Sequence, residues 1–234
     1  MMIYIINLDS ANERLQNSLE QISFFSFQAL RVPAIYAKNI KVCDMKYVSP
    51  GVAAIWKSHI KAIEIFLESK DEFVVITEDD FIINDIDLFR KSEHIFNDNE
   101  LDLLQMGFLI TGIDVFLKKF VENYQYRLFR LLSKIAGFVP FLEKKIQNRM
   151  RLMDVRRFDK SLIPFSFLPG AHCYIISRRL AAEILNMNSP QVLSTDDFFT
   201  ALARMRSFNM ARLKTSAVSQ SQLPSQVGKR FHQY

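Results

Sequence analysis

Three adjacent acidic residues, Glu78, Asp79 and Asp80, follow a short apolar run that has the composition of a buried strand. Neighbouring carboxylates repel one another, and this repulsion raises their pKa values unless a cation lies among them. Hard divalent ions such as Mg²⁺ and Mn²⁺ prefer oxygen ligands of this kind. The pattern therefore predicts a metal site with Glu78 and Asp80 as ligands, because these two acids flank Asp79. A solvated acidic turn without a ligand is the alternative interpretation.

The elements that must position these acids alternate between strand and helix patterns. Strands are expected at Ile3–Ile6, Phe73–Thr77, Leu101–Met106 and Cys173–Ile176, and helices after a Ser10/Glu13 capping box, over Val52–Leu67 and over Arg178–Leu185. This alternation predicts an α/β fold with a mainly parallel sheet and helices on both faces. Ligands bind such sheets at the carboxyl ends of the strands, which is where the acidic run falls. The polar tail from Ser219 to Gln226 is expected to be irregular.

The stretch from about Val115 to Lys160 has a different character from the rest of the chain. It contains twelve Lys and Arg against four Asp and Glu, about +8, whereas the net charge of the whole chain is +5. The apolar residues that share one helical face in this stretch are Leu117, Val121, Tyr124, Leu128, Leu131 and Ile135. We expect one domain over residues 1–234 with a basic amphipathic helical insertion that contacts the anionic inner leaflet of a membrane. Packing on the protein's own core or in a homodimer is the alternative.

Composition excludes several classes of protein. A hydrophobic content of 49%, with 6 Gly and 7 Pro, excludes a disordered or collagen-like chain. Two distant cysteines and a start without the charged region of a signal peptide favour a cytoplasmic protein, with peripheral attachment to the inner face of the membrane. The sequence lacks a phosphate-binding glycine loop, zinc spacing and any recognisable nucleic-acid module. Nucleotide binding is therefore expected to depend on a metal, and nucleic acid is not an expected partner.

Short motifs occur in a characteristic order along the chain: Asn7-Leu8-Asp9 with Arg14, Ser58-His59, Ile76-Thr77-Glu78-Asp79-Asp80, Gly170 with Tyr174-Ile175-Ile176-Ser177, and Asp196. In this combination the chain resembles glycosyltransferase family 25, which includes bacterial lipooligosaccharide galactosyltransferases and collagen galactosyltransferases. The resemblance covers most of the chain outside about 115–160. It implies a GT-A-like fold, a UDP-sugar as donor, and Mn²⁺ or Mg²⁺ at the acidic run. The chain departs from the family at Gly51-Val52-Ala53-Ala54-Ile55, where the usual pattern is Gly-Glu-x-Gly-Cys.

The resemblance also implies roles for residues outside the metal site. The expected catalytic or acceptor-binding acids are Asp196 and Asp197, and the expected donor contacts are Asn7, Asp9, Arg14, His59, Asp79 and Gly170. Several of these residues have a structural alternative. His59 suits a hydrogen-bonded core position, Asp9 can cap local backbone, and an acid at a helix start is favoured by the helix dipole.

Together these features lead us to expect transfer of a sugar, galactose by the resemblance, from UDP to a hydroxyl group of a glycolipid or oligosaccharide such as lipooligosaccharide or lipopolysaccharide. A metal offsets charge on the departing diphosphate, and in an inverting reaction a base takes the acceptor proton. A metal-dependent phosphoester hydrolase could use the same acids. An inactive peripheral membrane-binding module of a polysaccharide assembly complex is the non-enzymatic alternative. A hydrolase would release phosphate without an acceptor, and a binding module would have no affinity for UDP.

Overall fold

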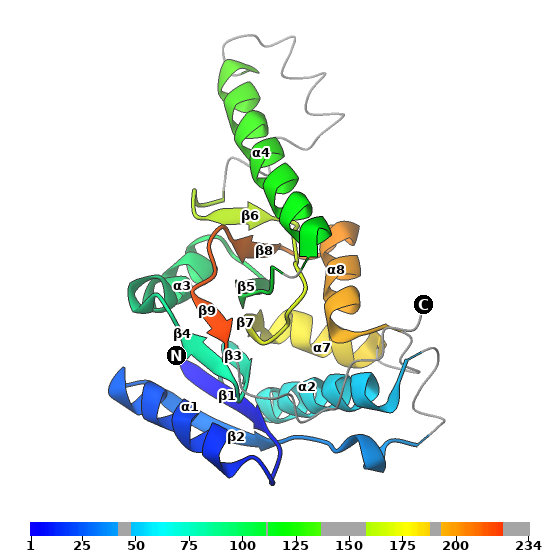
Figure 1. Ribbon diagram of the computed structural model, residues 1–234. Coiled ribbons are helices and arrows are strands. Elements are labelled where there is room, and N and C mark those ends of the chain that lie inside the picture. The colour runs from blue at the N-terminus through cyan, green and yellow to red at the C-terminus, as the bar shows by residue number, and fades with distance from the viewer. Residues whose placement is uncertain (42–47, 111, 137–157, 188–192, 222–234) are drawn as a thin grey trace.

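The computed structural model describes residues 1–41, 48–110, 112–136, 158–187 and 193–221 (Figure 1). Its elements in chain order are β1 (Met2–Asn7), α1 (Asn12–Phe24), β2 (Gln28–Pro33), η1 (Ala37–Asn39), α2 (Pro50–Glu68), β3 (Phe73–Glu78), β4 (Phe81–Ile83), α3 (Ile86–Asp98), β5 (Leu103–Gly107), α4 (Gly112–Ala136), β6 (Leu162–Pro164), β7 (Cys173–Ser177), α7 (Arg178–Met187), α8 (Thr195–Met205), β8 (Met210–Leu213) and β9 (Val218–Gln220). The expected α/β class is confirmed.

The strands form one sheet of mixed direction, with the order β2-β1-β3-β7-β5-β8-β6. Parallel pairing joins β1 to β2 and β3, and β5 to β8 and β9. Strand β7 lies between β3 and β5 and runs antiparallel to both, while β4 and β6 pair antiparallel with β9 and β8. Six of the nine described strands therefore run in one direction and β4, β6 and β7 run in the other, and the sequence did not predict the direction of β7.

Helices cover both faces of the sheet, as the sequence predicted. Side chains along a strand alternate between the two faces, so Tyr4 and Ile6 of β1 pack in one buried cluster with residues of α2, α7 and α8. Ile3 and Ile5 of the same strand pack in a second cluster with residues of α1 and α3. Figure 1 shows the strands between α1 and α3 on one side and α2, α7 and α8 on the other. The sheet thus separates two apolar cores, and its strand ends lie at the rim between them.

The start of α1 differs from the expected capping box. The helix begins at Asn12, with Ala11 at the N-cap position and without a side-chain hydrogen bond to the cap. The Ser10 backbone N–H instead donates to the Tyr36 hydroxyl at 3.0 Å, and that hydroxyl donates to the Ser10 Oγ at 3.2 Å. The predicted capping box is therefore wrong, because a tertiary contact with Tyr36 engages the serine.

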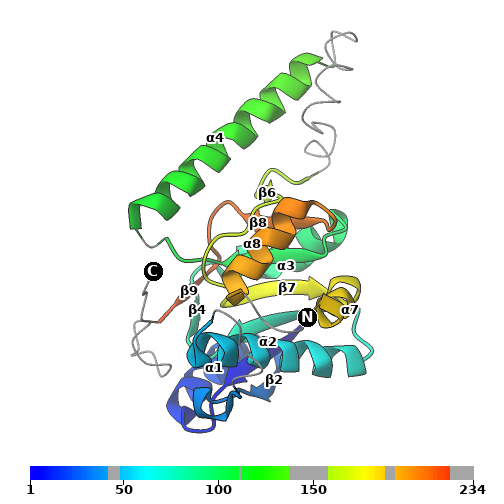
Figure 2. The same cartoon turned by 90° about the vertical axis from the view of Figure 1, so that its right-hand side faces the viewer.

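Helix α4 is the described part of the predicted basic insertion, and it is helical as expected. In Figures 1 and 2 it extends from the sheet well past the other labelled helices and strands. Residues 137–157 of the insertion lie outside the described residues. Across the part of the chain that the structure describes, no helix has the length and hydrophobicity required to cross a bilayer.

Candidate functional site

The acidic run lies at the carboxyl end of β3, at the rim of the sheet. Glu78 is the last residue of β3, and its register partner on the parallel neighbour β1 is Ile6. The next residue of β1, Asn7, therefore ends at the same rim, as the rule for ligand sites in such sheets requires. Asn7 is buried. Its Nδ2 donates to the Asp79 Oδ2 at 2.7 Å and to the Ala11 carbonyl at 3.0 Å.

Arg14 of α1 joins two of the three acids. Its guanidinium forms ion pairs with Asp79 and, at 2.9 Å, with the Asp80 Oδ2. The Arg14 Nε is buried and has no hydrogen-bond partner among the described residues. The structure thus brings together four of the residues that the sequence assigned to the donor and the metal, Asn7, Arg14, Asp79 and Asp80.

Asp9 lies further out at the same rim. It is exposed and forms an ion pair with Arg31 of β2. The Arg31 Nε donates to the Asn7 Oδ1 at 2.9 Å, so Asp9 connects to the acidic run through Arg31 and Asn7. An exposed ion pair of this kind contributes about 0–1 kcal/mol to stability.

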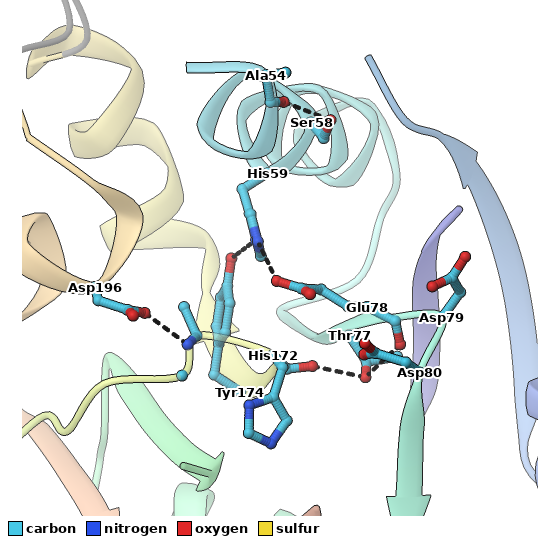
Figure 3. Close-up of polar contacts among 12 residues, drawn as sticks. Ala54, Ser58, His59, Thr77, Glu78, Asp79, Asp80, His172, Tyr174 and Asp196 are labelled. Atoms are coloured by element: carbon cyan, nitrogen blue, oxygen red, sulfur yellow. Dashed lines mark hydrogen bonds and ion pairs between the residues drawn. The ribbon is translucent and has the colours of Figure 1, made fainter. Parts of the chain in front are cut away.

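Glu78 points away from Asp79, toward His59 of α2 (Figure 3). The Glu78 Oε1 lies 3.7 Å from the His59 Nε2. On the other side of the ring, the His59 Nδ1 lies 2.9 Å from the Tyr174 hydroxyl of β7. Burial, followed by the nearby Glu78 carboxylate, raises the Tyr174 pKa well above its ordinary value. Tyr174 therefore stays a neutral phenol that donates to Nδ1, and we assign the imidazole hydrogen to Nε2, which faces Glu78.

The start of α2 and its packing place His59 at this position. The Ser49 side chain caps the helix by accepting from the Val52 backbone N–H at 3.4 Å, and Pro50 occupies its first turn. Ser58, which precedes His59, donates to the Ala54 carbonyl at 2.7 Å and accepts from the Ile35 backbone N–H at 2.8 Å. The Ser58 hydroxyl therefore has a structural role through these two hydrogen bonds, and His59 is the member of the Ser-His motif that faces the acids.

His172 is a second buried histidine at the site, and neither of its ring nitrogens has a hydrogen-bond partner within the described residues. Two glycines leave room for its ring: a Cβ on Gly107 would lie 2.5 Å from its Nε2, and one on Gly170 would lie 2.9 Å from its Nδ1. Burial lowers the His172 pKa, so the ring is neutral at pH 7. Gly170 has a φ of 101° and would also meet the Leu109 backbone, so close packing explains this glycine whether or not a donor lies nearby.

The two candidate catalytic acids of α8 face different surroundings. The Asp196 Oδ1 accepts from the Ala171 backbone N–H at 2.8 Å, in the loop that leads into β7, and its charge acts to raise the pKa of His172. Asp197 is exposed, and its Oδ2 accepts from the helix-capping Ser194 Oγ at 2.7 Å. Figure 3 shows Asp196 beside the segment that carries His172 and Tyr174. Asp196 therefore lies beside the segment that carries His172, and the contacts of Asp197 belong to the start of the helix.

The polar tail contributes a residue that the sequence did not assign. The first part of the tail is not irregular as expected, because Val218–Gln220 forms strand β9 beside β4 and β5. The Gln220 Nε2 lies 3.4 Å and 3.5 Å from the two carboxylate oxygens of Asp80, and the Ser221 backbone N–H donates to the Asp80 carbonyl at 2.6 Å. Residues 222–226 of the tail lie outside the described range.

The electrostatics of Asp80 bear on the predicted metal. Burial, followed by the nearby charge of Glu78, raises the Asp80 pKa to about 7, while Arg14 acts in the opposite direction. Among the described residues, no group of three or more acids, histidines or cysteines is arranged to hold an ion. The described residues therefore do not form a site in which the protein supplies every ligand of a metal ion. Glu78 and Asp80 suit an ion that takes water and substrate phosphate as its further ligands, because a cation there would offset both the burial and the Glu78 charge that raise this pKa.

The sequence pointed to most of the site but not to all of it. Tyr174 lies in a motif that we quoted without assigning it a role, and Gln220 lies in a segment expected to be irregular. His172 gave no signal, because a lone histidine before a strand has no spacing to interpret.

A scan against protein-family models finds no match to this chain, and a search of curated proteins finds no match either.

Proposed function

We propose that the protein is a metal-dependent glycosyltransferase of GT-A-like fold that moves a sugar, galactose in the first instance, from a UDP-sugar to a glycolipid or oligosaccharide acceptor such as lipooligosaccharide. One observation carries the proposal: at the rim of a mostly parallel α/β sheet, burial and then the nearby charge of Glu78 raise the Asp80 pKa to about 7. Such a pair binds a cation favourably. The resemblance of the motifs to glycosyltransferase family 25 supplies the reaction.

The surrounding residues suit binding of a nucleotide diphosphate. Arg14 has a buried Nε without a partner among the described residues, and its guanidinium already lies at Asp79 and Asp80. A diphosphate at this edge would meet that cation, and planar guanidinium groups bind phosphate oxygens in pairs. When bound, a divalent ion supplies further positive charge that offsets the charge on the departing diphosphate.

Two further groups suit the acceptor side of the reaction. The Ala171 N–H donates to Asp196, and this hydrogen bond orients a carboxylate that can take a proton from an acceptor hydroxyl. Tyr174 fixes the orientation of His59, whose Nε2 faces Glu78. In this proposal Asp196 is the base, and His59 and Tyr174 position Glu78.

Calorimetry of UDP binding tests the donor site. We expect the full-length protein to bind UDP with Mn²⁺ present and to lose most of this affinity when the metal is chelated. Asp80→Asn should abolish the metal-dependent part, whereas Asp87→Asn, at an exposed acid of α3, should leave it unchanged. A thermal-shift series of UDP-sugars then identifies the donor, because a ligand at 100 times its dissociation constant adds about 2.7 kcal/mol to the free energy of unfolding. Equal UDP affinity in Asp80→Asn and the parent would exclude this metal site.

A comparison of the two acids of α8 tests the catalytic role. Asp196→Asn keeps an oxygen for the Ala171 N–H but removes the base, so we expect the transfer rate to fall at least about 100-fold with little change in donor affinity. Asp197→Asn should retain nearly full activity. Full activity in both variants would leave the two acids with a structural role only. Release of phosphate without an acceptor would instead indicate the hydrolase, and absence of UDP binding would indicate the binding module.

A further inference from the structure

Helix α4 contacts the rest of the protein through its polar side. The Lys118 Nζ donates to the Phe167 carbonyl at 3.0 Å. The Glu122 Oε2 accepts from the Ser166 Oγ at 2.6 Å and from the buried Arg212 of β8 at 3.2 Å. A further hydrogen bond of 3.1 Å joins the same guanidinium to the neighbouring Asn123 Oδ1. The side that normally faces water therefore faces the sheet.

The opposite side of α4 is apolar and faces away from the body of the protein. Its large hydrophobic residues are between 39% and 75% exposed, and they are Ile113, Phe116, Leu117, Phe120, Val121, Tyr124 and Leu128. An amphipathic helix of a globular protein normally packs its apolar side on the core and leaves its polar side in water. This orientation is reversed in α4. Core packing, one of the alternatives open at the level of sequence, therefore does not apply to these residues.

Charge identifies the kind of partner that suits this face. Between Gln125 and Lys160 the sequence carries ten Lys and Arg against three Asp and Glu, and the described Arg127 is exposed. We propose that the apolar face of α4, from Ile113 to Leu128, inserts into the interface of an anionic lipid membrane. Phenylalanine, leucine and tyrosine are typical of the buried face of interfacial helices, and lysine and arginine near the surface are attracted to acidic headgroups.

A second copy of the chain is a weaker candidate for the same face. Pairing two α4 helices would bring together two helices that each carry five Lys and Arg against two Asp and Glu, about +3, and like charges at such an interface oppose association. An anionic membrane attracts the same charge. The helix would then lie between the lipid and the sheet, with its polar side toward the sheet. This proposal does not depend on the glycosyltransferase assignment, because lipid binding is measured without donor or acceptor.

The experiment is co-sedimentation of the full-length protein with vesicles. One set contains about 30% phosphatidylglycerol in phosphatidylcholine, and the other contains phosphatidylcholine alone, each at low and high salt. The test variant combines Phe116→Ser, Phe120→Ser and Tyr124→Ser, whose parent side chains are all more than half exposed. The control combines Phe24→Ser on α1 and Met205→Ser at the end of α8, which remove exposed apolar side chains elsewhere. Light scattering of each protein without lipid gives its oligomeric state.

We expect binding to the anionic vesicles that weakens at high salt, because exposed charges are screened over about 8 Å at physiological ionic strength. The partition coefficient of the α4 variant should fall at least about tenfold, and the control should bind as the parent does. Recovery of the parent in the supernatant under all conditions would overturn the proposal. So would equal binding of the parent and the α4 variant. A parent dimer that the α4 variant loses, without vesicle binding, would assign the face to a second copy.

Discussion

The carboxyl group of Asp80 lies in surroundings that oppose its ionisation. Burial and the charge of Glu78 raise its pKa from 3.8 to about 7, although Arg14 lies at 2.9 Å and favours the charged form. An acid with a raised folded-state pKa makes the native state less stable at neutral pH than at acidic pH. Binding sites are where perturbed pKa values concentrate. This single residue therefore connects the local electrostatics to the proposed function.

The stability of the protein without divalent metal should depend on pH through this group. The folded-state pKa of Asp80 exceeds the unfolded one, so its contribution is fully present below pH about 4 and is lost as the pH rises through about 7. In a chelator, we expect the free energy of unfolding to fall by about 1–4 kcal/mol between pH 5 and pH 8. Asp80→Asn should flatten this dependence, whereas Asp87→Asn should keep it. Chemical denaturation across the pH range measures both, and parallel profiles for the parent and Asp80→Asn would contradict the assignment.

Spacing in the sequence was sufficient to predict residues that stand at a strand end or share a motif. Glu78 and Asp80 follow an apolar run, and Asn7 follows another, so their meeting at one rim was predictable. Tyr174 and His172 lie at the same rim because β7 pairs antiparallel with β3. A single sequence does not encode that pairing in any local pattern. The contacts that these two residues make were therefore beyond sequence reasoning.

At the scale of elements, the loop between β6 and β7 positions the residues that the site takes from β7 and the segment before it. This loop carries Gly170 and leads into His172 and Tyr174. It is fixed to the sheet by Gln105 of β5, which is fully buried. The Gln105 Nε2 donates to the carbonyls of Leu168 and Gly170 at 2.7 Å and 3.1 Å, and its Oε1 accepts from the Leu168 N–H at 2.9 Å. One amide thus satisfies three buried backbone groups.

Loss of the hydrogen bonds of the Gln105 amide should destabilise the protein even when the volume of the side chain is kept. Gln105→Met keeps the shape but leaves three buried backbone groups without partners, so we expect the free energy of unfolding to fall by about 2–4 kcal/mol. Gln16→Met, at an exposed position of α1, is the matched control and should change it by less than about 0.5 kcal/mol. Urea unfolding followed by tryptophan fluorescence measures both. A loss below about 1 kcal/mol in Gln105→Met would mean that water replaces the amide.

At the scale of the whole molecule, the helical character of α4 was predictable from the sequence, but its orientation was not. Periodicity identifies an apolar side of a helix, but it does not identify what that side contacts. The orientation depends on Arg212, which lies in the short strand β8 and is fully buried. Burial lowers the pKa of Arg212, and the Glu122 carboxylate offsets part of this effect. The ion pair of these two residues therefore connects the projecting helix to β8, the strand next to one edge of the sheet.

Removal of one partner of this ion pair should affect both the stability and the attachment of α4. Glu122→Gln leaves the buried Arg212 guanidinium without a counter-charge, so we expect the free energy of unfolding to fall by about 2–4 kcal/mol. Arg212→Met in the Glu122→Gln background should recover part of the loss, because no unpaired charge then remains buried. Glu64→Gln on the exposed side of α2 is the control. Denaturation of the four proteins of the double-mutant cycle measures the coupling between Glu122 and Arg212.

Limited proteolysis provides the complementary measurement of attachment. Trypsin should cleave after the exposed Arg127 faster in Glu122→Gln than in the parent, because the helix separates from the sheet more often when its ion pair is absent. Asn123 and Lys118 keep their contacts with Arg212 and Phe167, so the rest of the fold should resist cleavage as before. Equal stability and equal cleavage of Glu122→Gln and the parent would show that the Glu122–Arg212 ion pair does not hold α4 in place. The orientation that exposes its apolar side would then depend on the contacts of Lys118 and Asn123 instead.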